Sequence, residues 1–372
     1  MNNITPKQLY KRQTTLAEIG EAGQQKLLQT KVVIVGCGGL GSAAAVYLAA
    51  SGIGNMHLID YDIVDASNLH RQVFYKTDDI GKPKAKVLAD HIKEISPFVK
   101  VSYSNTAISK NIVFDEINDY DFVLDCTDSL PIKYLLNDAC VLKDKALIYG
   151  SLYKYDGYVS SFNIKTSKTT YGCNLRDAFP EISKEAIPNC SEVGTLNTIV
   201  GIIGLMQANE VLKLVANIGK PLTSQLLIYN SLENSQFKMK LKKSFTKEMI
   251  QQLFEAENYE DVNCLVQDEA LLISAKELKA QLSLQSESRS FQTISVIEDI
   301  DTPLPFQVDA KVPFSKFDDI SNHIEQSQNT ETDNNFVIIC NRGVLSYTAT
   351  QQLKKKYPNL NILSLKGGIT NY

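Results

Sequence analysis

The chain of 372 residues lacks several features that would assign it to a particular class of partner. It has no basic excess, because 38 Lys and Arg face 42 Asp and Glu and give a formal net charge of −4. Its most apolar stretch, residues 198–215, is interrupted by Gln207, Asn209, Glu210 and Lys213, which favours a buried helix over a membrane span. We therefore expect neither a nucleic acid nor a membrane as a partner.

Cysteine is also sparse and unpaired. The seven cysteines are an odd number, scattered without a close pair, so they indicate no disulfide framework. Residues 1–10 are polar and lack the apolar core of a signal peptide. We therefore expect a cytoplasmic protein, where thiols stay reduced. The composition is that of an ordinary globular protein, and the length favours two domains.

The first part of the chain predicts a doubly wound α/β fold. Short apolar runs rich in β-branched residues, of which Lys31–Val35 is the clearest, predict buried parallel strands. Helical segments alternate with them, as is typical of this fold. The strands are expected at residues 31–35, 56–60, 99–103, 122–125, 146–150 and 225–230, and the helices at residues 42–50, 82–95 and 194–216.

A second, smaller α/β unit is expected after a polar and charged stretch. We place the first domain at residues 1–245, a linker at residues 246–264 and the second domain at residues 265–372. Its strands are expected at residues 291–297, 336–340 and 361–365, and its helices at residues 274–282 and 346–356.

A glycine-rich loop follows the first predicted strand. Gly36, Gly38 and Gly41, with Gly39 between them, stand where a strand leads into a helix. This arrangement turns backbone N–H groups and a helix N-terminus toward phosphate oxygens, although it can also be a tight structural turn. Asp60 ends the next strand and is placed to accept hydrogen bonds from a ribose. The loop alone does not distinguish ATP from a dinucleotide.

Polar and cationic residues downstream favour ATP. Asn68, Arg71, Gln72 and Lys84 follow the expected ribose-binding carboxylate within about 25 residues. Cations of this kind suit a triphosphate that is being cleaved, which carries more charge than the diphosphate of a dinucleotide. Asp128 follows another strand and could hold Mg²⁺. A NAD-dependent oxidoreductase is the alternative of another class, but no acid or base for hydride transfer is evident.

Six segments in order resemble the MoeB/ThiF/HesA adenylyltransferases, which are bacterial relatives of ubiquitin-activating enzymes. They are residues 10–13, 36–42, 59–62, 68–72, 81–84 and 125–128. The resemblance implies a Rossmann-like ThiF/MoeB fold over residues 10 to about 240. It also implies ATP-dependent adenylation of the C-terminal glycine of a small ubiquitin-like sulfur carrier ending in Gly-Gly. Such carriers serve molybdopterin or thiamine synthesis, and the motifs do not distinguish the two.

The same resemblance implies a role for individual residues. Asp128 would ligate Mg²⁺. Arg12 would reach the phosphates in the neighbouring subunit's site, which implies a homodimer. Nucleotide contacts fall to Gly36, Gly38, Gly39, Gly41, Asp60, Asp62, Asn68, Arg71, Gln72, Lys84 and Asp128.

The cysteines differ from the family pattern at the zinc site, and the role of one further cysteine is undecided. Many members hold a structural zinc with two Cys-x-x-Cys pairs, but only Cys173 stands where the first pair is expected, and residues 238–251 contain no cysteine. Four thiolates cannot be assembled there, so we expect no zinc. Cys190 precedes the long apolar helix, where relatives can carry a thiol that binds the carrier covalently. A catalytic Cys190 and a loop cysteine without a catalytic role both remain open.

The second domain resembles the rhodanese sulfurtransferases, more weakly. A buried strand ends in Cys340, and the loop toward the next helix can curl around its sulfur, with Arg342 adding positive charge. Gly367 and Gly368 resemble the closing rhodanese motif, whereas residues 295–298 lack the usual acid and arginine. Two hypotheses follow. Either Cys340 carries sulfur to the carrier, with a cysteine desulfurase as a candidate donor, or the domain only docks partners.

Overall fold

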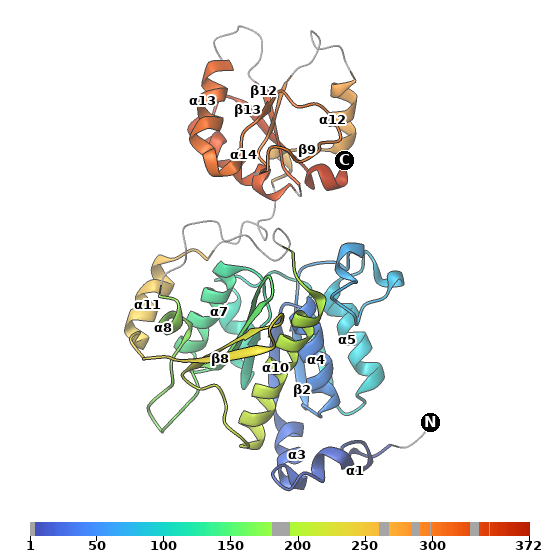
Figure 1. The fold of residues 1–372 in the computed structure, drawn as a ribbon, viewed down its shortest axis with the longest axis vertical. Coiled ribbons are helices and arrows are strands. Elements are labelled where there is room, and N and C mark those ends of the chain that lie inside the picture. Colours follow the sequence, from blue (N-terminus) through green and yellow to red (C-terminus); the bar gives the residue numbers. More distant parts are fainter. Residues whose placement is uncertain are drawn as a thin grey trace. The chain divides into compact units, whose positions relative to one another are not determined.

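The computed structural model describes residues 4–180, 194–259, 268–283, 291–297, 299–327, 335–341 and 343–372. The chain forms two compact units, residues 1–261 (unit 1) and residues 262–372 (unit 2), which Figure 1 shows in sequence colours.

The described residues of unit 1 form an eight-stranded sheet in the order β3-β2-β1-β4-β5-β6-β7-β8. The first five strands are parallel, and β6, β7 and β8 are antiparallel additions at one edge. The strands are β1 (Lys31–Val35), β2 (Asn55–Ile59), β3 (Lys100–Ser104), β4 (Phe122–Asp125), β5 (Ala146–Tyr153), β6 (Asp156–Phe162), β7 (Gln225–Asn230) and β8 (Ser235–Lys240).

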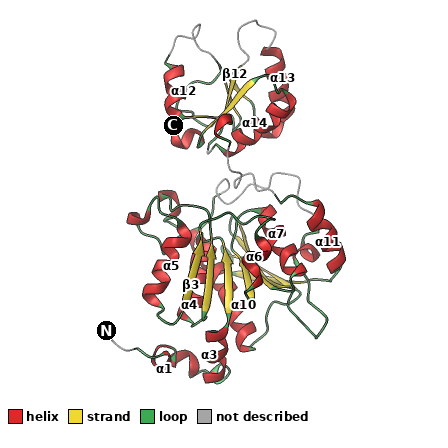
Figure 2. Cartoon of the chain, turned by 180° about the vertical axis from the view of Figure 1, so that it is seen from behind, coloured by secondary structure: helices red, strands yellow, loops and turns green. Residues whose placement is uncertain are grey.

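Helices cover both faces of this sheet (Figure 2). One hydrophobic core includes Leu48, Leu88 and Ile203 from α4, α5 and α10, and the other includes Ile117, Leu135 and Phe254 from α6, α7 and α11. The doubly wound α/β prediction is therefore confirmed. The helices are α1 (Pro6–Leu9), α2 (Lys11–Thr14), α3 (Gly20–Gln29), α4 (Gly39–Ala50), α5 (Lys84–Ile95), α6 (Val113–Asn118), α7 (Leu130–Leu142), α8 (Leu175–Ala178), α10 (Asn197–Ala216) and α11 (Lys247–Ala256).

The apolar helix α10 belongs to this core. It is the one helix among the described residues that is long and apolar enough to cross a membrane. Ile199, Ile203 and Val211 are nevertheless buried in the core of unit 1. At Gly204 the helix comes so close to α4 that an added Cβ would lie 2.5 Å from the carbonyl oxygen of Leu40. The apolar residues of α10 therefore belong to the buried core of unit 1, and Gly204 allows the close packing of α10 on α4.

The predicted linker at residues 246–264 contains the helix α11, which packs against unit 1. Ile250 and Phe254 are buried, and the Phe254 ring lies 4.9 Å from the Phe114 ring of α6. Unit 1 accordingly extends to residue 261. The segment is polar on average because the outer face of α11 is charged, although its inner face is apolar. Composition alone therefore predicts a linker, and that prediction is wrong for this helix.

Unit 2 contains a second sheet, whose described strands are all parallel and lie in the order β11-β10-β12-β13-β9. Ile294 and Ile338 pack with residues of α13 and α14, whereas Val337 and Ile339 pack with Leu278 of α12. The elements are β9 (Leu272–Ile273), β10 (Gln292–Ser295), β11 (Ala310–Lys311), β12 (Asn335–Ile339), β13 (Asn361–Leu365), α12 (Ala275–Leu282), α13 (Phe317–Ser327) and α14 (Val344–Lys356).

Candidate functional site

The glycine loop joins β1 to the N-terminus of α4. A Cβ added at Gly36, whose φ is +92°, would lie 2.7 Å from the carbonyl oxygen of Cys126. A Cβ added at Gly41 would lie 1.8 Å from the carbonyl oxygen of Gly36. At Gly38, however, it would meet only Gln72 Nε2, at 3.5 Å. Two glycines therefore let the loop pack tightly, and the third leaves an open side next to a helix N-terminus, which is favourable for phosphate.

The predicted segment 68–72 lies against this loop. A Cβ at Gly39 would come within 3.3 Å of the carbonyl oxygen of Arg71. Gln72 is buried, and its Nε2 donates to Asn68 Oδ1 at 3.1 Å. The buried Gln72 Oε1 has no hydrogen-bond partner among the described residues. Because buried acceptors are nearly always paired, this oxygen calls for a donor that a ligand at the loop could supply.

Asp60 is held at the loop by backbone donors. Its Oδ2 accepts from Cys37 N at 2.6 Å, and its Oδ1 accepts from Asp62 N at 2.8 Å. Burial raises the pKa of Asp60, and the nearby Lys84 ammonium opposes that shift. The structure thus brings the expected ribose-binding carboxylate to the glycine loop.

Lys84 begins α5 and joins the same group of residues. Its side chain is only 5% exposed, and its Nζ donates to Asp62 Oδ2 at 2.5 Å. Arg71 is half-buried on the neighbouring segment, where its Nη1 donates to the carbonyl oxygen of Ser67 at 3.1 Å. Two of the predicted cations therefore lie on segments beside the glycine loop.

Asp125 and Lys133 form a buried ion pair that the sequence analysis missed. Lys133 Nζ of α7 lies 3.2 Å from both carboxylate oxygens of Asp125 and 2.8 Å from the carbonyl oxygen of Gly150. Thr127 N and Oγ1 donate to the same carboxylate at 3.1 and 2.8 Å. The pair fixes the turn that presents the exposed Asp128 at the carboxyl edge of the sheet. A single lysine within the apolar helix 130–142 was the available signal.

Gln207 is a second residue that was missed. Its Nε2 donates to the carbonyl oxygens of Asp125 at 2.8 Å and of Ile148 at 3.1 Å, and its Oε1 lies 3.5 Å from Cys126 Sγ. It is fully buried and ties the carboxyl end of β4 to the neighbouring strand β5. In the sequence it was noticed only as a polar interruption of an apolar run.

Arg12 is not brought to the glycine loop of its own chain. It is exposed on α2, and the adjacent Gln13 donates through Nε2 to the carbonyl oxygen of Ser51 at 2.9 Å. Ser51 follows the C-terminus of α4, whereas the glycine loop lies at the N-terminus of that helix. Twelve helical residues separate the two ends by about 18 Å.

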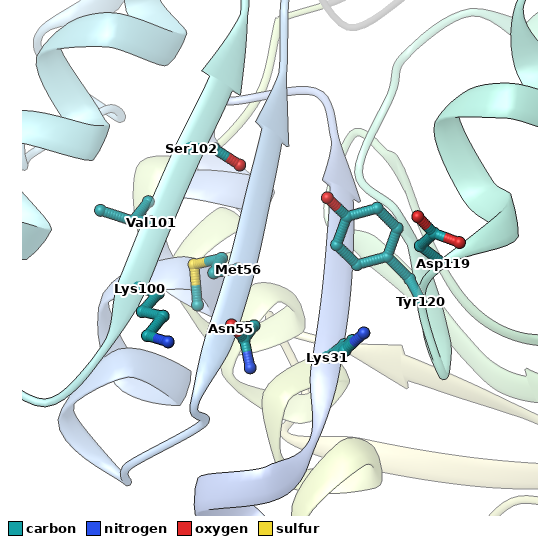
Figure 3. Close-up of a pocket in the computed structure, with 8 residues that line it drawn as sticks. All are labelled: Lys31, Asn55, Met56, Lys100, Val101, Ser102, Asp119 and Tyr120. Carbon is teal, nitrogen blue, oxygen red and sulfur yellow. The ribbon is translucent and has the colours of Figure 1, made fainter.

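A separate cavity of about 320 Å³ lies at the amino-terminal ends of the strands, whereas the glycine loop follows the carboxyl end of β1 (Figure 3). Lys31, Asn55 and Lys100, the first residues of β1, β2 and β3, line it together with Tyr120. None of the predicted site residues lines this cavity.

In unit 2, Cys340 follows β12 directly, and its sulfur is surrounded by donors. Its Sγ accepts from the backbone N–H groups of Gly343 at 3.1 Å and of Ser346 at 3.3 Å. Gly343 has a φ of +82°, and a Cβ there would lie 2.7 Å from Gly367 N, so the two predicted motifs meet at this point. Arg342 lies outside the described residues.

The cysteines considered for zinc binding and for covalent chemistry are Cys173 and Cys190. Cys190 lies outside the described residues. Cys173 is buried, its N–H donates to Ser224 Oγ at 3.1 Å, and burial raises the pKa of its thiol. The described ranges contain no group of three or more His, Cys, Asp or Glu side chains that could hold a metal. The expected absence of zinc stays a prediction. The segment after β8 is bound by Asp177, which accepts from Ser244 N at 2.6 Å.

The class of this protein follows from a family model. Residues 10–249 match the ThiF family, and the chain belongs to it.

The relatives extend the likeness to both units. A sulfur carrier protein adenylyltransferase of Thermus thermophilus is 38% identical over 63% of this chain and 87% of its own. An adenylyltransferase and sulfurtransferase MOCS3 of Drosophila grimshawi is 33% identical over 97% of this chain and 82% of its own. A probable adenylyltransferase/sulfurtransferase MoeZ of Mycobacterium tuberculosis is 31% identical over 97% and 91%.

Solved structures support the fold of unit 1. The crystal structure of E. coli MccB with ATP has a TM-score of 0.55 and 24% identity, and covers 66% of this chain and 73% of its own.

Proposed function

We propose that this protein uses ATP to adenylate the C-terminal glycine of a ubiquitin-like sulfur carrier and then transfers sulfur to it through Cys340. The observation that carries the nucleotide site is the open side of Gly38 beside the side-chain amide of Gln72, whose buried Oε1 has no hydrogen-bond partner among the described residues. The names of relatives that match along nearly the whole chain support the same pair of activities.

The residues gathered at the loop suit ATP. Asp60 would accept hydrogen bonds from the ribose, and Gln72 Oε1 would accept from a hydroxyl or amino group of the nucleotide. The loop amides, Arg71 and Lys84 would bind the phosphates. Mg²⁺, held by Asp128, would neutralise phosphate charge.

Adenylation then needs alignment and charge neutralisation, and no protein nucleophile. A carboxylate oxygen of the carrier's glycine attacks the α-phosphorus of ATP. The bond from that phosphorus to the bridging oxygen breaks, and pyrophosphate leaves. Arg71 and Lys84 stabilise the charge that develops on the phosphates.

The adenylated glycine is an activated acyl donor for sulfur. The terminal sulfur of a persulfide on Cys340 attacks its carbonyl carbon, and AMP leaves. An incoming thiol then cleaves the sulfur–sulfur bond, which releases the carrier as a thiocarboxylate and leaves a disulfide. A cysteine desulfurase is a candidate source of the persulfide sulfur. Cys190 is a candidate for the residue that binds the carrier covalently. If it is, the covalent adduct of enzyme and carrier seen under non-reducing conditions should be lost in Cys190→Ala.

The position of Arg12 at the far end of α4 supports a homodimer in which Arg12 of one protomer serves the site of its partner. Mixing inactive Arg12→Ala and Asp128→Ala proteins should then restore part of the activity, because one hybrid site carries both native residues. No recovery after subunit exchange would exclude this arrangement. We propose a cytoplasmic location for the dimer.

Carrier-dependent exchange of pyrophosphate into ATP tests the central proposal. Arg71→Ala and Asp128→Ala should each lower the exchange by at least about 100-fold, since each removes charge stabilisation at the phosphates. Cys340→Ala should leave it unchanged. Full exchange in Asp128→Ala would show that the site is wrongly assigned. Thermal protection by NAD instead of ATP with Mg²⁺ would favour the oxidoreductase alternative.

A further inference from the structure

A buried pair of serine hydroxyls lies next to the sulfur of Cys340. Ser346 Oγ is 3.2 Å from Cys340 Sγ and 2.8 Å from Ser364 Oγ. Ser346 stands in the first turn of α14 and Ser364 in β13, and both are fully buried. The two hydroxyls therefore extend from the sulfur as a short row of hydrogen-bonded groups that is shielded from water.

The hydrogen bonds that link the sulfur and the two hydroxyls can reverse their direction, because each hydroxyl has one proton to donate and lone pairs that accept. With Cys340 as a thiol, the S–H can donate to Ser346 Oγ, whose hydroxyl then donates to Ser364 Oγ. With Cys340 as a thiolate, Ser364 donates to Ser346, and Ser346 donates to the sulfur. No proton passes along the row: the thiol proton goes to solvent, and the hydroxyls only rotate.

We propose that Ser364 is a positioning residue that stabilises the anionic sulfur of Cys340 by acting through Ser346. The proposal rests on the proposed sulfur transfer through Cys340. The rotated Ser346 hydroxyl becomes a third donor to the sulfur, beside the N–H groups of Gly343 and Ser346. Hydrogen bonds to ionised acceptors are the stronger kind, and each hydroxyl polarises the next. The reactive form of a cysteine is its thiolate.

The fold holds this row of groups in place from two sides. In the parallel register of β12 and β13, Ser364 lies opposite Ile338, two residues before Cys340. Ile369 N donates to the carbonyl oxygen of Cys340 at 3.0 Å, which ties the segment after β13 to the cysteine. Ser321 of α13 is a useful contrast, because its buried hydroxyl has no hydrogen-bond partner among the described residues.

Alkylation of Cys340 by iodoacetamide measures its thiolate directly. The rate is followed by mass spectrometry of the peptide that contains Cys340, so the other cysteines do not interfere. At neutral pH, Ser346→Ala should react about tenfold more slowly and Ser364→Ala about threefold more slowly than the unchanged protein. The matched control Ser321→Ala should react at the unchanged rate. In Ser364→Ala the pH profile should move to higher pH and reach the same plateau.

A second pair of variants separates the hydroxyl from packing. Ser364→Thr and Ser364→Val add side chains of nearly equal shape, but only threonine keeps the hydroxyl. The Thr variant should react faster than the Val variant by about threefold. Equal rates for this pair, or an unchanged rate in Ser364→Ala, would overturn the proposal.

The same preparations keep this test apart from the proposed function. Carrier-dependent pyrophosphate exchange should be unaffected by every serine variant. If the unchanged protein neither exchanges pyrophosphate nor forms thiocarboxylate, the proposed function fails, while the alkylation rates still decide the role of Ser364.

Discussion

Cys37 of unit 1 and Cys340 of unit 2 occupy similar places in two parallel sheets. Each follows the carboxyl end of an inner strand, β1 or β12, and precedes the N-terminus of a helix, α4 or α14. Their surroundings are nevertheless opposite. Burial, and then the nearby charges of Asp60 and Cys126, raise the pKa of the Cys37 thiol well above its ordinary value. The sulfur of Cys340 instead accepts hydrogen bonds from two backbone N–H groups.

The difference shows that the course of the loop, and not the strand–loop–helix order, decides the chemistry. In unit 1 the Cys37 side chain lies in the hydrophobic core, its N–H bonds to Asp60, and the open side of Gly38 is free for a ligand. In unit 2 the loop turns through the left-handed Gly343 and surrounds the sulfur itself. The same element order can therefore bind either a phosphate or an anionic sulfur.

The largest difference in activity is expected between alanine variants of the two cysteines. Cys340→Ala should abolish thiosulfate sulfurtransferase activity and carrier thiocarboxylate formation, because it removes the sulfur-bearing atom, and should leave pyrophosphate exchange intact. Cys37→Ala should keep both activities. Sulfur transfer that persists in Cys340→Ala would favour the docking-domain hypothesis.

A smaller effect is expected from alanine in either loop. Gly41→Ala should weaken ATP binding by about 100-fold, because its Cβ would overlap the carbonyl oxygen of Gly36. Gly343→Ala should lower sulfur transfer to a similar extent, because its φ is left-handed and its Cβ would crowd Gly367 N. Isothermal titration with ATP and a sulfurtransferase assay measure the two effects. Each variant should leave the other unit's activity unchanged, and a cross-effect would show that the loops are not independent.

The buried ion pair of unit 1 predicts a change in stability. Lys133→Met should lower the free energy of unfolding of unit 1 by about 3–5 kcal/mol, because it leaves the Asp125 carboxylate buried and unpaired. Urea unfolding should show this loss in unit 1 and no change in unit 2. Lys26→Met, at an exposed position of α3, is the matched control. A loss of equal size in the control would refute the assignment to the ion pair.

The smallest effect concerns pH. Burial lowers the pKa of His57, with the adjacent Glu116 opposing the shift. Below the ordinary value of about 6.5 the unfolded chain binds a proton that the folded unit 1 binds less readily. The stability contribution of this residue is therefore lost as the pH falls through that range. His57→Gln should flatten the pH dependence of the thermal midpoint of unit 1 between pH 5.5 and 7.5, and an unchanged slope would contradict this account.

Much of the framework of the candidate site was predictable from local patterns. The run Lys31–Val35, the glycine loop and the acid at position 60 are contiguous signals of strand, turn and ligand. The linker prediction failed at α11, since Ile250 and Phe254 bury themselves only when the rest of unit 1 is folded. The buried partners Lys133 and Gln207 were missed for the same reason.

The alternation of strands and helices, the two glycine-containing loops and the family resemblance depend on residue types at short spacing, so they can be read before the fold is known. Which polar groups meet depends on how the chain folds. Asp125 and Lys133 stand eight residues apart, Gln207 bonds a carbonyl 82 residues away, and Ser364 reaches Ser346 across 18 residues. Long-range pairing of this kind follows from how sheets and helices stack, since burial forces each polar group to find a partner that spacing in the sequence does not specify.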